Sequence, residues 1–173
     1  YPEFLYDFKF SNDGKEFKKY DRLDVKGFGF TYENHDYNFL TWDAKANKQI
    51  FLMPVTGDIP PNGVYFILRS LEGQIPVYSM FWEKEQFSEI PDPRQLSAPY
   101  RKESKGVLRK REIIFSHPTK GFLYMSTQYP MIIKQAELPG YLELEPEFSQ
   151  TLKKKEGILT IVKKYNGWKR SQM

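Results

Sequence analysis

The feature that most constrains the fold of this chain is a two-residue alternation of aromatic side chains with other side chains. It is clearest over residues 4–10, where every second residue is Phe or Tyr. Successive side chains of a β-strand point to opposite faces, so this spacing predicts a half-buried strand. A turn sequence occupies residues 11–14, and residues 17–20 are expected to return as the partner strand.

The same arrangement recurs along the first half of the chain. Residues 37–41 and 49–53 form one expected strand pair, and residues 64–69 and 75–82 form another. Hairpins at such regular intervals favour an antiparallel meander. Further strands are expected over residues 107–115, 122–127, 131–134, 141–144 and 158–165. The 14 Phe, 12 Tyr and 3 Trp also favour strands. We therefore predict an all-β fold, an antiparallel β-sandwich or barrel.

One short helix is expected near residues 147–156. Pro146 suits a first helical turn, Phe148 and Leu152 are four residues apart, and Gly157 suits a helix end.

The prolines divide the chain at one place. Pro91, Pro93 and Pro99 disfavour both helix and ladder, so residues 90–106 are expected to form an irregular connection. We predict one β-rich domain over residues 1–173. The alternative is two subdomains, 1–90 and 106–173, joined by this Pro-rich loop.

Several functional classes lack their sequence signatures. Without cysteine there are no disulfides, thiolate metal sites or Cys nucleophiles. His35 and His117 have no further His or Cys at ligand spacing, and no phosphate-binding loop, nucleophile elbow or HExxH occurs. We therefore predict no metal ligand, cofactor or catalytic residue, and favour a protein that is not an enzyme.

The location in the cell is not indicated by any motif. No apolar run reaches the roughly 18–20 residues that span a bilayer. The sequence begins Tyr1-Pro2 without Met or a signal-like stretch, so we expect a soluble chain with a processed or trimmed N-terminus. The oligomeric state is not predicted.

Residues 26–30 read Lys-Gly-Phe-Gly-Phe. In nucleic-acid modules, glycines keep such a strand surface clear while alternating rings stack on bases. The motif resembles the signature of cold-shock domains. That resemblance implies a small OB-like barrel over residues 15–80, with Phe28, Phe30 and Tyr37 as stacking positions for single-stranded nucleic acid. The other interpretation is a glycine-containing strand whose rings fill the core.

A second candidate site is basic. Residues 1–90 carry 10 Lys/Arg and 14 Asp/Glu, whereas residues 91–173 carry 16 and 8. The cations are densest over residues 101–111, and the candidate binding residues are Arg101, Lys102, Lys105, Arg109, Lys110 and Arg111. Alternation predicts that Arg109 and Arg111 share one strand face, with Lys110 on the other. Such residues can contact an anionic partner or protect a sheet edge from pairing.

These observations favour a binding or assembly module for a macromolecular partner, with the ligand unidentified. Single-stranded nucleic-acid binding is the first alternative. The second is a carbohydrate-binding or hydrolytic domain, in which Trp42, Trp82 and Trp168 form a stacking platform or Glu143 and Glu145 serve as acid and base.

Overall fold

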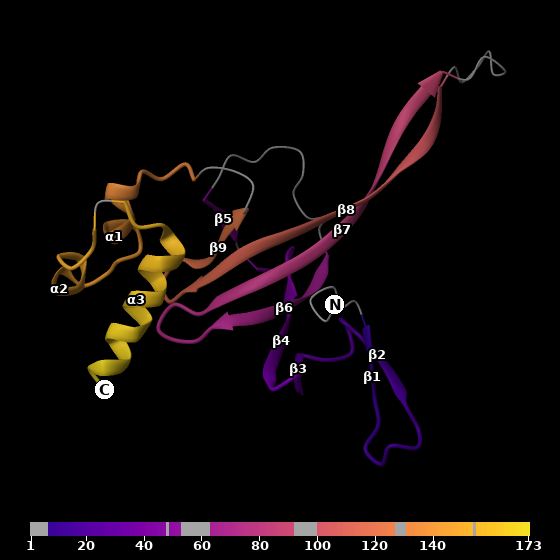
Figure 1. Cartoon of the computed structure of the whole chain (residues 1–173), viewed down its shortest axis with the longest axis horizontal. Helices are drawn as coiled ribbons and strands as arrows, with labels where there is room; N and C mark the ends of the chain where they lie inside the picture. Colours follow the sequence, from indigo (N-terminus) through magenta and orange to yellow (C-terminus); the bar gives the residue numbers. More distant parts are fainter. Residues whose placement is uncertain (1–6, 48, 53–62, 92–99, 127–130, 154) are drawn as a thin grey trace.

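The computed structural model of the chain describes residues 7–47, 49–52, 63–91, 100–126, 131–153 and 155–173 (Figure 1). Strands account for 48% of it and helical segments for 19%, which confirms the mostly β class. The strands are β1 (Asp7–Phe10), β2 (Lys18–Asp21), β3 (Gly27–Tyr32), β4 (His35–Asp43), β5 (Gln49–Phe51), β6 (Val64–Leu71), β7 (Val77–Pro91), β8 (Tyr100–His117) and β9 (Gly121–Ser126). The helical segments are a 3₁₀ turn η1 (Gln135–Glu137), α1 (Leu138–Tyr141), α2 (Pro146–Ser149) and α3 (Ile158–Ser171).

The strands form two sheets. β1 and β2 are a separate hairpin, and the other seven strands lie in the order β3-β4-β6-β7-β8-β9-β5. Strands from both halves of the alternative division, residues 1–90 and 106–173, therefore share one sheet. In the described part of the chain this sheet is open, with β3 and β5 at its edges. Residues 15–80 therefore do not close into the small barrel that the cold-shock resemblance implies, because β2 pairs with β1 and β3 is an edge.

Two of the three expected hairpins are present, and one is wrong. β1 pairs with β2 and β6 with β7, both antiparallel, and β8 also pairs antiparallel with β9. β4, by contrast, pairs with β3 and β6, while β5 runs parallel to β9 at the far edge. The reason is burial: Ile50 and Leu52 pack into the core beneath the C-terminal helices, which lies on the β9 side.

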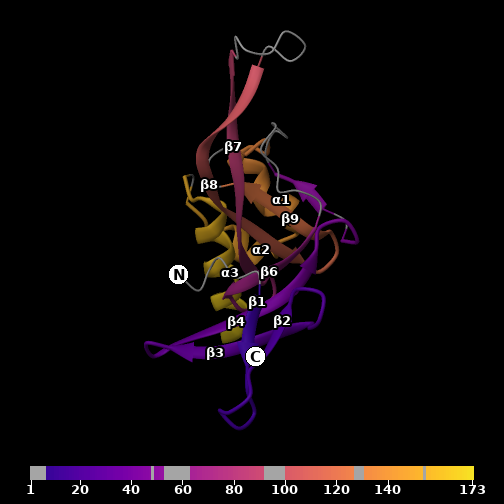
Figure 2. The same cartoon turned by 90° about the vertical axis from the view of Figure 1, so that its right-hand side faces the viewer.

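The expected irregular connection over residues 90–106 is also wrong where it is described. β7 and β8 continue as one ladder to the pair Pro91–Tyr100, so the prolines begin where the ladder ends. A register shift at Gln86/Phe87, opposite Gly106 with φ +108°, accommodates an extra residue within the ladder. The outer part of this hairpin is a two-stranded ribbon that projects from the body (Figures 1 and 2). Pro93 and Pro99 lie outside the described residues.

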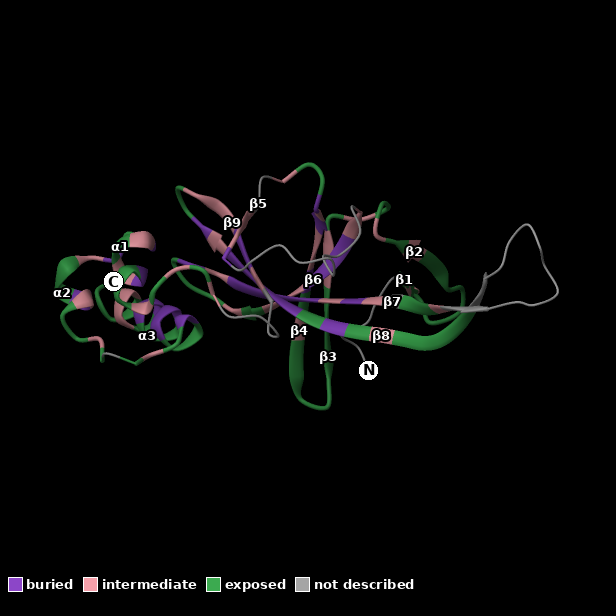
Figure 3. Cartoon of the chain, turned by 90° about the horizontal axis from the view of Figure 1, so that it is seen from above, coloured by how far each residue is buried: buried purple, intermediate pink, exposed green. Residues whose placement is uncertain are grey.

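The seven-stranded sheet has a buried side chain layer on each face. Figure 3 shows the buried residues concentrated in the middle of the sheet and on the inner side of α3, while the outer ribbon is exposed. On one face, strand residues such as Val77, Ile113 and Phe115 pack against the C-terminal helices. On the other face, Trp42, Trp82 and their neighbours form the second cluster.

The C-terminal segment is helical where strands are expected. Residues 131–134 contain no strand, and residues 141–144 form the end of α1 and a turn in which Glu143 has φ +53°. Residues 158–165 begin α3, because Ile158, Ile161, Val162 and Tyr165 recur at helical spacing and all face the core. The helix expected near 147–156 is limited to α2, which ends at Ser149. Among the described residues, no helix has both the length and the apolar character needed to cross a bilayer.

Candidate binding groove

A ladder of aromatic rings lies on one face of β3 and β4. The register pairs Phe28 with Phe39 and Phe30 with Tyr37, and alternation places all four rings on the same face. Ring centroids are 5.0 Å apart in the first pair and 5.3 Å in the second, with nearly parallel planes. The three positions that the cold-shock resemblance selects are therefore brought together.

The N-terminal hairpin covers one end of this ladder. Phe8 on β1 stacks on Phe28 with centroids 4.1 Å apart, and Phe66 on β6 meets Phe28 edge-on at 4.9 Å. Phe28 is half-buried as a result, whereas Phe30 is 36% exposed. The ladder thus runs from a covered end at Phe28 to an accessible end at Phe30.

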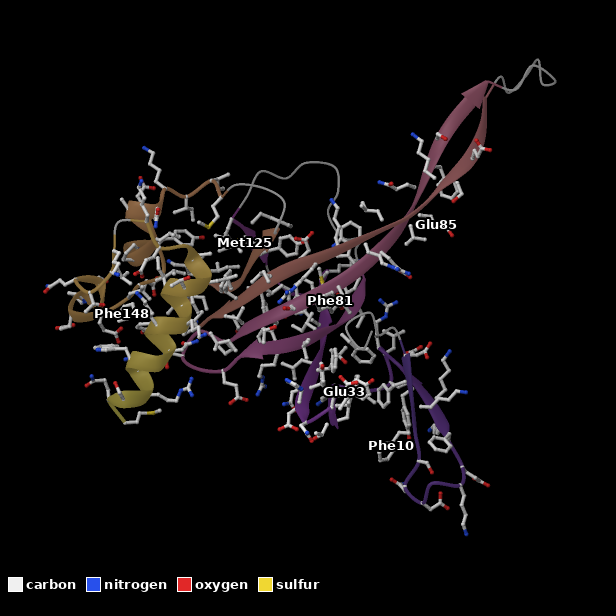
Figure 4. All side chains as sticks on the ribbon, viewed as in Figure 1. Phe10, Glu33, Phe81, Glu85, Met125 and Phe148 are labelled. Carbon is white, nitrogen blue, oxygen red and sulfur yellow. The ribbon has the colours of Figure 1, made fainter. Side chains whose placement is uncertain are left out.

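Between the hairpin and β3 lies a groove of about 630 Å³. Its lining residues are Phe8, Lys9, Phe10, Tyr20, Val25, Phe28, Gly29 and Phe30. Phe10 is 54% exposed, a large fraction for a ring next to so much apolar surface. In Figure 4, Phe10 lies on the side of the hairpin that faces the β3–β4 hairpin, whose turn carries Glu33. This groove has the size and lining of a ligand site.

The glycines of residues 26–30 have a structural reason. A Cβ on Gly27 would lie 2.5 Å from the Phe39 carbonyl oxygen, and one on Gly29 would lie 2.7 Å from the Asn38 side-chain oxygen. Gly27 needs glycine because the β4 backbone passes very close to it, whereas a side chain at position 29 would first have to displace the Asn38 amide. Thus the motif builds the edge strand that presents Phe28 and Phe30.

The basic residues of β8 are not gathered on one surface. Arg109 and Arg111 share a face, as alternation predicts: Arg109 pairs with Glu83 at 3.3 Å, and Arg111 donates to Ser79. Lys110 is on the opposite face, only 4% exposed, with its ammonium 5.7 Å from the centroid of the Trp82 ring.

The other cations of this stretch lie farther out along the ribbon. Lys105 is exposed. Arg101 and Lys102 belong to β8, opposite Ile90 and Glu89, and their side chains are outside the described part of the structure.

The tryptophans do not form an exposed platform. Trp42 and Trp82 are 2% and 1% exposed, and Trp168 is partly buried against Phe148 and Tyr165. Trp82 lies close to Tyr124, whose pKa is raised by burial and by the negative charge of Glu112. Trp42 and Trp82 belong to the core, and the accessible rings that gather around a cavity are those of the groove instead.

Glu143 and Glu145 line a small pocket of about 190 Å³ together with His117. Both carboxyl groups have pKa values below their usual range, Glu143 mainly because Lys120 and Thr119 donate to it, and Glu145 mainly because Lys169 does. An acid–base pair needs one carboxyl group with a raised pKa. Neither supplies it.

The His117 ring is used structurally. Its Nε2 is 2.9 Å from the Leu142 carbonyl oxygen and must donate, whereas Nδ1 accepts from the backbone N–H groups of Thr119 and Lys120. Both ring nitrogens therefore hold the β8–β9 turn against the end of α1. Among the described residues, no group of three His, Asp or Glu side chains is arranged to hold a metal ion.

Phe8, Phe10 and Tyr20 are groove residues that the sequence interpretation missed. The alternation over residues 4–10 identified their strand, but it cannot show that the hairpin packs beside β3 and leaves a gap between them. No protein-family model, curated protein or solved structure matches this chain.

Proposed function

We propose that this chain is a non-catalytic binding module that holds an apolar segment of a partner protein in the groove between the N-terminal hairpin and β3. The observation that carries the proposal is the groove itself, in which five aromatic rings of the described residues line about 630 Å³. Aromatic rings offer large, rigid contact area at little entropic cost, which is why they dominate protein-binding surfaces.

The charge around the groove favours a polypeptide over a nucleic acid. Residues 7–36 carry seven Asp/Glu and six Lys/Arg, a balance of −1. Nucleic-acid binding depends on cations that neutralise phosphates, and this region has no such surplus. The cation-rich stretch lies on β8, and none of the described groove residues comes from that strand.

A matched pair of surface variants tests the proposal. Peptides selected from a random display library on the purified chain serve as the probes, and fluorescence anisotropy measures their dissociation constants. Phe10 and Phe87 are 54% and 53% exposed, but only Phe10 lines the groove. Phe10→Ser should weaken binding at least about tenfold, since burying a Phe ring contributes roughly 1.5–3 kcal/mol. Phe87→Ser should leave the dissociation constant unchanged.

Two results would overturn the proposal. One is failure of the selection to yield any peptide whose binding distinguishes these variants. The other is tight, salt-sensitive binding of a single-stranded oligonucleotide that Phe30→Ser abolishes, which would establish the stacking function in its place.

A further inference from the structure

We infer that the segment held in the groove binds as an additional β-strand on the outer edge of β3. This inference rests on the proposed function and specifies its ligand: an extended polypeptide with apolar or aromatic side chains at every second position.

The hydrogen-bond register shows which backbone groups of β3 face outward. The Thr41 N–H donates to the Lys26 carbonyl oxygen at 2.9 Å, so the pair 26–41 is a bonded pair of the β3–β4 ladder. Bonded and non-bonded pairs alternate in an antiparallel ladder. Phe28, Phe30 and Tyr32 therefore bond to β4, while Gly27, Gly29 and Thr31 direct their N–H and C=O groups to the outer edge.

This edge lacks the usual protection. In the described part of the chain, no strand pairs with the outer side of β3. Natural edge strands are blocked by charged residues, proline or brevity. β3 has six residues, Gly-Phe-Gly-Phe-Thr-Tyr, with no charge and no proline. The other edge strand of the sheet, β5, has only three residues.

The edge and the groove belong to the same site. Gly29 lines the groove between Phe28 and Phe30, and its backbone groups point outward. A row of alternating donors and acceptors is complementary to another peptide backbone and to little else, so it identifies the ligand as an extended chain.

The spacing of the rings fits the side chains of an added strand. The centroids of Phe28 and Phe30 are 6.2 Å apart. Side chains two residues apart on a strand are separated by about 6.4–6.8 Å. A neighbouring strand about 4.8 Å away would place every second side chain beside these rings. It would thereby extend the aromatic ladder by one more row.

One substitution tests the backbone edge of β3 without removing a side chain that lines the groove. Thr31→Pro removes an outward N–H without removing a β3–β4 hydrogen bond, and an edge position of this kind accepts proline. It also removes the hydroxyl that donates to Asp36 at 2.6 Å, so Thr31→Val is the matched control. With the tightest selected peptide as probe, we expect Thr31→Pro to weaken binding at least about tenfold and Thr31→Val to change it less than twofold.

Two measurements on the wild-type chain do not depend on the folding of a variant. N-methylation of each backbone amide of the probe in turn should weaken binding at every second position only. Bound peptide should slow hydrogen exchange at Gly27, Gly29 and Thr31, whereas Phe28 and Phe30 are already bonded to β4.

The outcomes distinguish the two proposals. Binding that Phe10→Ser weakens but that shows no two-residue period on N-methylation would retain the groove and overturn strand addition. Absence of peptide binding would overturn the proposed function, and with it the inference that rests on it. A wild-type dimer that Thr31→Pro converts to a monomer would identify a second copy of the chain as the occupant, and would overturn the assignment to a partner.

Discussion

The side-chain amide of Asn166 forms hydrogen bonds with both backbone groups of Ile75, as the peptide group of a neighbouring strand would. Its Oδ1 accepts from the Ile75 N–H at 2.9 Å, and its Nδ2 donates to the Ile75 carbonyl oxygen at 2.8 Å. Both residues are 1% exposed. α3 is thereby attached to the segment that joins β6 to β7, and both backbone groups of the buried Ile75 are hydrogen-bonded.

Replacement of Asn166 by Ala should be strongly destabilising. Two buried backbone groups of Ile75 would lose their partners, so we expect a loss of about 2–4 kcal/mol in the free energy of unfolding. Urea denaturation measures this loss, and Lys163→Ala on the exposed side of α3 is the control. A loss below about 1 kcal/mol would mean that Ile75 finds other partners.

Gly73 and Gly167 should respond oppositely to substitution by Ala. Gly73 has φ +144°, and a Cβ there would lie 2.3 Å from the Asn166 side chain, so Gly73→Ala should lower the melting temperature. Gly167 is within α3 with open space around it, so Gly167→Ala should stabilise by about 0.5–1 kcal/mol. Calorimetry on both variants checks the prediction, and a stable Gly73→Ala protein would contradict the close packing of α3.

The raised pKa of Tyr165 predicts that the folded protein loses stability in alkali. Burial, together with the carboxylate of Glu145, raises the pKa of Tyr165 to about 12 from its ordinary value of 10. Because the folded pKa is the higher one, folding favours the neutral phenol. Its contribution is complete below pH 10 and is lost as the pH rises from 10 to 12.

The measurement compares wild type with Tyr165→Phe. Over that pH window the wild-type free energy of unfolding should fall more steeply than that of the variant, which cannot ionise. Ultraviolet absorbance of tyrosinate reports the titration independently. Parallel curves for the two proteins would show that Tyr165 does not carry the effect.

The outer ribbon should be the least protected part of the sheet. Within the described ranges, no third strand lies beside the β7–β8 ladder beyond Glu83–Arg109, whereas Glu112–His117 lies between β7 and β9. A two-stranded ribbon is only marginally stable in water. Amides of residues 100–107 should therefore exchange with solvent about a hundredfold faster than those of 112–117 by mass spectrometry. Equal protection would reveal a further contact that covers the ribbon.

The alternation of side chains predicted the strands well because each hairpin is a local structure. Residues 7–10 have a sharp two-residue period, whereas residues 64–69 and 107–115 are recognisable by their β-branched and aromatic side chains, and each of the three is part of a strand. Which strands become neighbours is a different question. β5 joins β9 because Leu52 fits beneath helices that lie far along the chain, and no local pattern encodes that choice.

The error over residues 158–165 has an identifiable cause. β-branched Ile158, Thr160 and Ile161 favour a strand by composition, but the buried residues recur at three and four positions as in a helix. For Leu142 and Leu144, a genuine alternation of side chains was interpreted as a strand although it has another origin. Their alternation comes from a turn at Glu143, whose positive φ directs both leucines inward.

The candidate site was only half predictable. Phe28, Phe30 and Tyr37 stand out in the sequence because they alternate around glycines. Phe8 and Phe10 share the same groove, but their place depends on how the N-terminal hairpin packs on the sheet. The edge position of β3 depends on the order of all the strands.

The order of elements along the chain has a consequence for biosynthesis. α3 covers the face that includes Val77, Ile113 and Phe115, yet the ribosome makes it after every strand it covers. A nascent chain that has been synthesised as far as β9 can therefore form the sheet, but one apolar face of that sheet is still exposed to solvent. Until α3 emerges, this apolar face is open to contact with neighbouring chains, which makes the incomplete chain prone to aggregation.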